Sequence, residues 1–199
     1  MIRIFEILFS ISVIIVGLPI FLGISLLILL YDGFPIFFKH DRIGKDGKII
    51  KVYKFRSMIK NAEEVLKKDK ELYKEYVKND FKISAEKDPR IMPFGKFLRK
   101  SSLDEIPQFI NVIIGNMSIV GPRPVVKDEL ETLYKENQNI YKSVNPGITG
   151  LWQISGRSNI KGQERVKLDI ETIKKKSLVF DCYIIIMTFF EVLRRRGAF

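Results

Sequence analysis

The hydrophobic residues of this chain are concentrated near its start, where none of the 25 residues at positions 7–31 is charged. As a straight helix, such a run is long enough to cross the hydrocarbon core of a bilayer. It is too long and too rich in isoleucine for a secretory signal. The sequence therefore predicts that this segment inserts into a membrane.

Gly17-Leu18-Pro19 interrupts the run near its middle. Proline inside a helix removes a backbone donor and bends the helix axis. Two arrangements fit the residues: a kinked helix that spans the bilayer, which the residues alone favour, and a broken helix that enters and returns on one face. In both, the basic segment after Pro35 predicts that the rest of the chain is cytoplasmic, because positively charged flanks remain on that side.

The pattern after this run predicts a hairpin followed mainly by helices. Asp46-Gly47 between apolar stretches is a strong hairpin-turn signal, and segment 52–56 is typical of a strand on which Lys54 and Arg56 share a face. Helical periodicity covers 61–81 and 126–139, a short strand is expected at Ser118–Val120, and Lys96, Arg99 and Lys100 form a basic patch after two prolines. The apolar segment 180–193, followed by three arginines, fits either an interfacial helix or a core helix with a solvated basic end.

Composition narrows the chemistry that is available. The formal charge is +11, which fits anionic lipid, phosphorylated substrates or nucleic acid, and the apolar start of the chain favours a membrane with anionic headgroups. A single cysteine, Cys182, excludes an intrachain disulfide, and a single histidine, His40, argues against a zinc site or a histidine-based triad. Catalysis would rest on carboxylates, lysine, arginine and a hard metal ion.

The adjacent acidic residues Asp104 and Glu105 are the most informative local feature. Ser102-x-x-Glu105 matches a capping box, but Pro107 would then be the fifth helical residue and would lose a hydrogen bond. With Asp104 as the N-cap of a helix that ends at Gly115, Pro107 costs nothing. Free N–H groups at a helix start favour anions, including phosphate. Capping alone explains the pattern equally well, so a catalytic role remains one of two alternatives here.

Several basic residues lie in segments predicted as turns or strand ends, namely Lys54, Arg56, Arg99, Lys100, Arg123 and Arg157. Phosphoryl transfer depends mainly on positioning and on neutralising charge, usually with Mg²⁺, and a nucleophilic carboxylate can form an acyl phosphate. Gly147, Gly150 and Gly156 would let the backbone approach a phosphate. Trp152 is either a core aromatic residue, which is favoured, or a platform for a uracil ring.

Four segments, in this order, resemble the bacterial sugar transferase family, the monotopic polyprenyl-phosphate phosphoglycosyl transferases. They are Lys54-Phe55-Arg56-Ser57-Met58, Ser102-Leu103-Asp104-Glu105-Ile106-Pro107-Gln108, Asn116-Met117-Ser118-Ile119-Val120-Gly121-Pro122-Arg123-Pro124 and Pro146-Gly147-Ile148-Thr149-Gly150. The resemblance covers essentially the whole chain from the membrane segment onward. Four ordered motifs are far more specific than any one of them.

The resemblance implies a re-entrant membrane helix in residues 1–33, broken at Pro19, which replaces the spanning interpretation. Residues 34–199 are then the catalytic domain, on the cytoplasmic face of the bacterial inner membrane. Asp104 corresponds to the nucleophile that attacks the sugar-bearing phosphate and releases UMP, and Glu105 to its partner in proton transfer or in positioning metal and substrate. Mg²⁺ is the implied cofactor, with Asp104 as its expected ligand. Substrate-binding residues follow from the same resemblance: Lys54, Arg56, Arg99, Arg123 and Arg157.

We therefore expect an α/β-leaning, mostly helical fold: a single monotopic membrane domain with a broken N-terminal helix, a small β-hairpin and interfacial amphipathic helices. The expected reaction transfers a hexose-1-phosphate, galactose or glucose, from a UDP-sugar to undecaprenyl phosphate. This would be the first membrane step in assembling an exopolysaccharide, capsule or lipopolysaccharide.

The expected partners are membrane lipids, downstream glycosyltransferases and a second copy of the chain, with no role for nucleic acid. Larger family members carry further membrane helices and a regulatory domain, so we expect this chain to be a minimal catalytic unit. The rival interpretation is a non-catalytic, membrane-tethered scaffold of a glycan-assembly complex.

Overall fold

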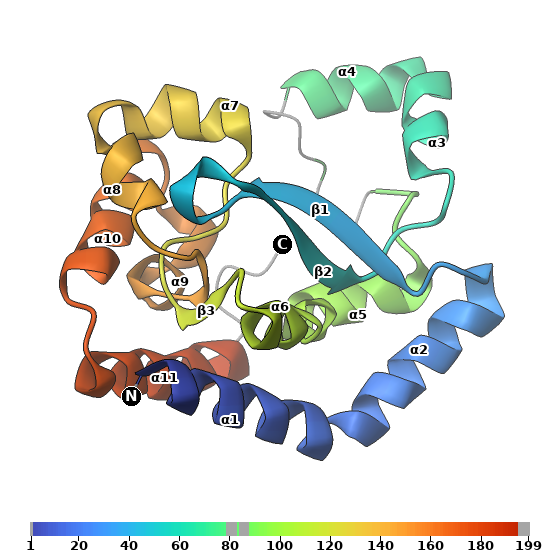
Figure 1. Cartoon of the computed structure of the whole chain (residues 1–199). Helices are drawn as coiled ribbons and strands as arrows, with labels where there is room; N and C mark the ends of the chain where they lie inside the picture. Colours follow the sequence, from blue (N-terminus) through green and yellow to red (C-terminus); the bar gives the residue numbers. More distant parts are fainter. Residues whose placement is uncertain (1, 79–82, 84–87, 195–199) are drawn as a thin grey trace.

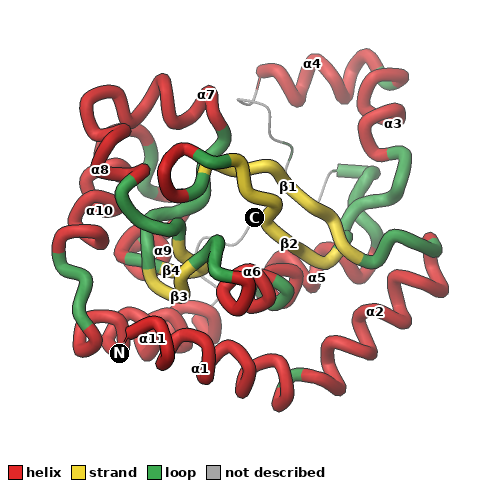
Figure 2. Tube along the Cα trace, in the orientation of Figure 1, coloured by secondary structure: helices red, strands yellow, loops and turns green. Residues whose placement is uncertain are grey.

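The computed structural model describes residues 2–78, 83 and 88–194 and is mostly helical, with two small two-stranded sheets (Figures 1 and 2). This confirms the expected mostly helical fold with a small hairpin. Helices α1 (Ile2–Val16), α2 (Leu18–Asp32) and α11 (Leu178–Arg194) run along one edge of the molecule, and the hairpin crosses its centre (Figure 1).

The apolar N-terminal run forms two helices, α1 (Ile2–Val16) and α2 (Leu18–Asp32), which are bent by 62° at their junction. Pro19 lies in the first turn of α2, where its missing N–H has no helical partner to lose, and the predicted break is confirmed. Among the described residues no single helix is long and apolar enough to cross a membrane. The bent pair, taken together, has the length and composition to do so.

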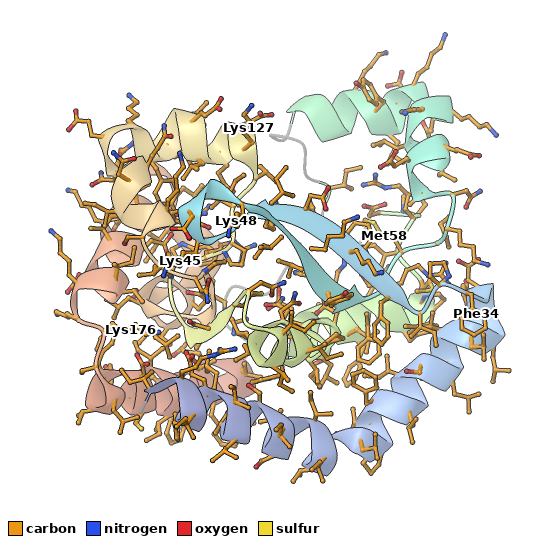
Figure 3. The ribbon with its side chains drawn as sticks, in the orientation of Figure 1. Phe34, Lys45, Lys48, Met58, Lys127 and Lys176 are labelled. Atoms are coloured by element: carbon orange, nitrogen blue, oxygen red, sulfur yellow. The ribbon has the colours of Figure 1, made fainter. Side chains whose placement is uncertain are left out.

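Strands β1 (Phe37–Ile43) and β2 (Ile49–Phe55) form the predicted antiparallel hairpin. At its turn, Asp46 and Gly47 have φ angles of 58° and 74°, the positive values that the Asp-Gly signal predicts. Figure 3 shows Lys45 and Lys48 at this end of the hairpin.

The segment after the hairpin forms α3 (Ala62–Lys68) and α4 (Lys70–Lys78), which confirms a helical pair; its predicted extension to residue 81 lies outside the described residues. The next helix, α5 (Pro93–Ser101), carries Arg99 and Lys100 in its last turn. The prediction that these two residues lie in a turn-rich segment was therefore wrong. Pro93 starts this helix instead of preventing it, because proline is well tolerated at the first helical position.

The segment predicted as one polar helix at 126–139 is broken into short pieces. They are α7 (Lys127–Glu129), the π-helical turn η3 (Leu130–Tyr134), η4 (Lys135–Asn137) and α8 (Gln138–Lys142). Lys135 has a φ of 39°, which a regular helix does not permit. The buried rings of Tyr134 and Tyr141 pack with centroids 4.9 Å apart across this break, so tertiary packing accompanies the departure from the local periodicity.

A second sheet pairs β3 (Ser118–Val120) with β4 (Gly147–Thr149) in parallel. A β-carbon at position 147 would lie 2.2 Å from the amide nitrogen of Gly121, and one at position 150 would lie 2.5 Å from the carbonyl oxygen of Gly121. Gly147 and Gly150 are thus explained by close approach of two backbone segments. The approach of these glycines to a phosphate stays a prediction.

The chain continues through α9 (Leu151–Ser155), η5 (Arg157–Asn159), α10 (Gly162–Lys174) and α11 (Leu178–Arg194). Helix α11 packs partly against the core and is partly exposed, so the structure does not choose between the two alternatives drawn from its sequence. Asp181 and Ile184 are buried against the core, while Val179 and Phe189 are exposed. Residues 195 and 196 of the basic end lie outside the described residues.

Candidate active site

The acidic pair lies on a short turn between two helices. After α5, Ser102 adopts a left-handed conformation with φ 57°, and the 3₁₀ turn η2 (Leu103–Glu105) leads into α6 (Gln108–Ile114). Leu103 and Ile106 pack into an apolar cluster that also contains residues of α2 and β2. The apolar residues that flank Asp104 and Glu105 therefore anchor this turn to α2 and β2.

The predicted position of Asp104 as a helix N-cap was wrong. Asp104 lies inside the 3₁₀ turn, α6 begins only after Pro107, and neither Asp104 nor Ser102 makes a side-chain capping bond. The chain turns at Ser102 before it can continue as a helix. The predicted end of this helix is confirmed, since Gly115 follows α6 with a φ of 104°.

Glu105 forms an ion pair with Lys54 of β2, whose Nζ lies 2.6 Å from Oε1. The buried Asn111 of α6 links this helix to β2. Its Oδ1 accepts from the Tyr53 amide at 2.9 Å, and its Nδ2 donates to the Lys51 carbonyl at 2.7 Å. Helix α6 is thereby fastened to β2, which brings together Lys54 and Glu105, 51 positions apart in the sequence.

The two carboxyl groups differ in acidity. Burial and the neighbouring charge of Glu105 raise the pKa of Asp104 to about 6, against the opposing charges of Lys54 and Arg99. Burial would also raise the pKa of Glu105, but the charge and hydrogen bond of Lys54, with Arg123 and Arg157 nearby, lower it. The arrangement holds Glu105 ionised and leaves Asp104 as a buried carboxyl that titrates close to neutral pH.

Three further predicted cations lie around this pair. Arg99 donates from Nε to the Ser57 hydroxyl at 2.9 Å, and burial lowers its pKa although Asp104 and Asp88 oppose this. Arg157 donates to the Ser102 hydroxyl at 3.3 Å. Arg123 lines the same small pocket as Lys54 and Glu105. The structure thus brings Lys54, Arg99, Arg123 and Arg157 together around the pair.

Arg56 does not join this group. It follows β2, and its buried guanidinium binds the Asp32 carboxylate and donates to the Gly33 carbonyl at 2.6 Å. Because β2 ends at Phe55, the predicted shared face with Lys54 does not extend to Arg56. The structure gives Arg56 a different position from the predicted one, as a clamp between the end of α2 and the end of the hairpin.

The pocket beside Glu105 includes residues that the sequence did not single out as a site, namely Arg42, Gln108 and Gln153. A signal for Arg42 was present: in the hairpin register it faces Ile50, so it shares a face with Val52 and Lys54. Burial, and then the charge of Arg123, lower the pKa of Arg42 to about 10. Gln153 Oε1 is buried and has no hydrogen-bond partner among the described residues.

Trp152 is 7% exposed, and its Nε1 donates to the Ile160 carbonyl at 2.9 Å. The structure therefore supports the favoured interpretation of a core aromatic residue. Its ring does not line the pocket that contains Glu105.

No group of three or more histidine, cysteine, aspartate or glutamate side chains that could hold a metal ion occurs within the described ranges. Mg²⁺ is, however, commonly held by one or two carboxylates together with substrate phosphates. The adjacent carboxyls of Asp104 and Glu105 meet that requirement, and the like charge that raises the pKa of Asp104 is one that a cation would offset.

Comparisons with known proteins show which family the chain is similar to. The family model described as bacterial sugar transferase matches residues 1–195. The chain is 42% identical over 200 residues to the undecaprenyl-phosphate galactose phosphotransferase of Salmonella typhimurium, covering 99% of this chain but only 41% of that protein. It is 42% identical to the exopolysaccharide production protein ExoY of Sinorhizobium fredii, and the match covers 99% of this chain and 87% of that protein. It is also 39% identical to the UDP-glucose:undecaprenyl-phosphate glucose-1-phosphate transferase of Escherichia coli, and this match covers 91% of this chain and 38% of that protein.

Proposed function

The chain belongs to the bacterial sugar transferase family, and from that premise we propose that it transfers a hexose-1-phosphate from a UDP-sugar to undecaprenyl phosphate. The similar proteins named for galactose and glucose transfer make these two hexoses the first candidates. The product would enter exopolysaccharide or capsule assembly, where downstream glycosyltransferases would extend it.

One observation carries this proposal: a buried carboxyl of raised pKa, Asp104, lies beside an ionised Glu105 and within a ring of four cations. We propose that an oxygen of Asp104 attacks the phosphorus that bears the hexose. The new P–O bond forms as the bond to the UMP oxygen breaks, and UMP leaves with both electrons of that bond. A phosphate oxygen of undecaprenyl phosphate then attacks the same phosphorus and releases the Asp104 carboxylate.

The chain's own residues supply most of the charge stabilisation in this scheme. Lys54 and Arg123 face the pocket and would offset charge on the diphosphate. Glu105 holds Lys54 in place through the 2.6 Å ion pair. When bound, Mg²⁺ would add a divalent charge against the phosphates, with Asp104 and Glu105 as the residues to hold it.

We further propose that residues 1–33 insert into the membrane as a re-entrant pair and that residues 34–199 form the catalytic domain. Exposed apolar side chains support this on α1, α2 and α11, among them Leu8, Leu26 and Phe189. The apolar cluster beneath the turn of Asp104 includes Ile24 and Ile28 of α2. This packing supports the proposal that Asp104 and Glu105 lie close to the lipid-contacting helices, near the level of the carrier phosphate. The cytoplasmic face of the bacterial inner membrane is the proposed location.

The test is UMP release by the purified protein in detergent or nanodiscs, with undecaprenyl phosphate, Mg²⁺ and a panel of UDP-sugars. We expect release with UDP-galactose or UDP-glucose, and incubation with radiolabelled UDP-hexose alone should leave label on the protein. Asp104→Asn should abolish both signals. A scaffold without catalysis would release no UMP with any sugar, and turnover by Asp104→Asn would exclude Asp104 as the nucleophile.

A further inference from the structure

Two guanidinium groups lie over the ring of Trp152. The guanidinium carbon of Arg123 is 4.8 Å from the ring centroid and that of Arg165 is 5.3 Å away. Both distances are within the range of a cation–π interaction. Trp152 is buried, and with two guanidinium groups over the ring little of its surface remains for a nucleobase.

Side chains of α8 and α10 hold the backbone of Arg123 by hydrogen bonds. Its amide donates to Asp169 Oδ1 at 3.0 Å, and its carbonyl accepts from the Tyr141 hydroxyl at 3.1 Å. Asp169 is fully buried in α10, and its other oxygen accepts from the Tyr134 hydroxyl at 2.5 Å. Together with Pro122 and Pro124, which restrict the flanking dihedrals, these bonds leave Arg123 few backbone alternatives.

Arg165 and Arg123 differ in whether the guanidinium has an acidic partner within the fold. Arg165 forms an ion pair with Glu129, and its Nε lies 3.7 Å from Asp169 Oδ2. Within the described part of the chain, the Arg123 guanidinium has no hydrogen-bonding or ion-pair partner, and Arg123 lines the pocket with Lys54 and Glu105. The charge of Arg165 is thus compensated inside the fold, while that of Arg123 remains available to a ligand.

We propose that Trp152, Arg165 and Asp169 are positioning residues that fix the Arg123 guanidinium to bind the diphosphate of the nucleotide sugar. This inference rests on the proposed function, because that function supplies the diphosphate. In it Trp152 acts through Arg123 and does not stack on uracil. Arg123 lines the pocket and the three positioning residues do not, so they would influence phosphate binding through Arg123 and not base binding.

Binding of UDP and of uridine to purified protein, measured by calorimetry, tests this. Trp152→Leu removes the ring and should weaken UDP binding about 10-fold, the effect expected for one buried cation–π contact, with uridine affinity unchanged. Trp152→Phe keeps an aromatic face and should retain UDP affinity within about 3-fold. In an Arg123→Gln background, Trp152→Leu should have no further effect on UDP, because its action passes through Arg123.

Val166→Ala is the matched control. Val166 is 1% exposed, adjoins Arg165 in α10, and belongs to the same core. Val166→Ala should lose about as much stability as Trp152→Leu, but it should keep the wild-type ratio of UDP affinity to uridine affinity. If Val166→Ala also changes this ratio, the weaker UDP binding of Trp152→Leu reflects only lost packing, and the inference is overturned.

The wild-type protein provides a second measurement that does not depend on a variant folding. Trp152 is the only tryptophan of the chain, so its fluorescence reports on this position alone. Inorganic diphosphate should change the emission, uridine should not, and Arg123→Gln should remove the response. If uridine alone changes the emission, or Trp152→Leu weakens UDP and uridine equally, the ring contacts the base and the inference is overturned. Wild-type protein that binds neither UDP nor UDP-hexose would instead refute the proposed function.

Discussion

Replacing Asp104 by Asn should stabilise the folded protein while it removes activity. The native residue is 8% exposed, and its pKa is raised from 3.8 to about 6, first by burial and then by the charge of Glu105. Each pKa unit corresponds to about 1.4 kcal/mol, so holding this carboxylate ionised above pH 7 costs on the order of 3 kcal/mol. Asparagine has nearly the same shape and removes that cost.

The sign of the pH dependence follows from the direction of the pKa shift. Because the pKa is higher in the folded state, that state binds more protons between about pH 4 and pH 6. The cost is therefore absent below pH 4 and fully present above pH 6. We expect Asp104→Asn to raise Tm by about 6–12 °C at pH 8, and by much less at pH 4.5.

Thermal unfolding in detergent, followed by circular dichroism at several pH values, measures this difference. Asp128→Asn is the matched control, since it makes the same chemical change at an exposed carboxylate and should leave Tm unchanged at each pH. A lower Tm for Asp104→Asn at pH 8, or a gain of equal size at both pH values, would refute the reasoning that burial and like charge strain this carboxyl.

The same contacts support four further predictions. UMP release, measured as kcat/KM, should fall as the pH is lowered through about 6, because protonated Asp104 cannot attack phosphorus; a flat profile from pH 8 to 5 would contradict this. Glu105→Gln should reduce UMP release at least about tenfold by freeing Lys54, and an unchanged rate would remove Glu105 from the site. Arg56→Met should lower the free energy of unfolding by about 2 kcal/mol, because the Asp32 carboxylate loses its ion pair and keeps only the hydrogen bond from the Lys60 amide, whereas Lys74→Met in an exposed pair should have little effect on chemical denaturation. Gly147→Ala should prevent folding, because its β-carbon would meet the Gly121 backbone at 2.2 Å, whereas Gly23→Ala, which meets nothing within 4 Å, should express and unfold like wild type.

Local patterns in the sequence were sufficient for several elements. The bend between α1 and α2, the turn at Asp46-Gly47 and the end of α6 at Gly115 were all predictable, because each depends on one residue type in one backbone conformation. The acidic pair and four of its surrounding cations were named from motifs.

Other features of the site were decided by packing between distant segments. The sequence alone placed Asp104 at a helix start, but the apolar contacts of Leu103 and Ile106 and the reversal at Ser102 put it inside a 3₁₀ turn. Its raised pKa has the same origin, since burial is a property of the assembled fold.

Charge type and position along the chain follow from the sequence, whereas the partner of each charge is decided by the tertiary structure. Lys54 and Arg56 are two residues apart, yet one binds Glu105 and the other binds Asp32. Likewise, nothing local indicates that Trp152 lies beneath Arg123 and Arg165. An electrostatic or cation–π contact depends on distances of a few ångströms between elements, and these distances exist only after the hydrophobic core has fixed how the elements pack.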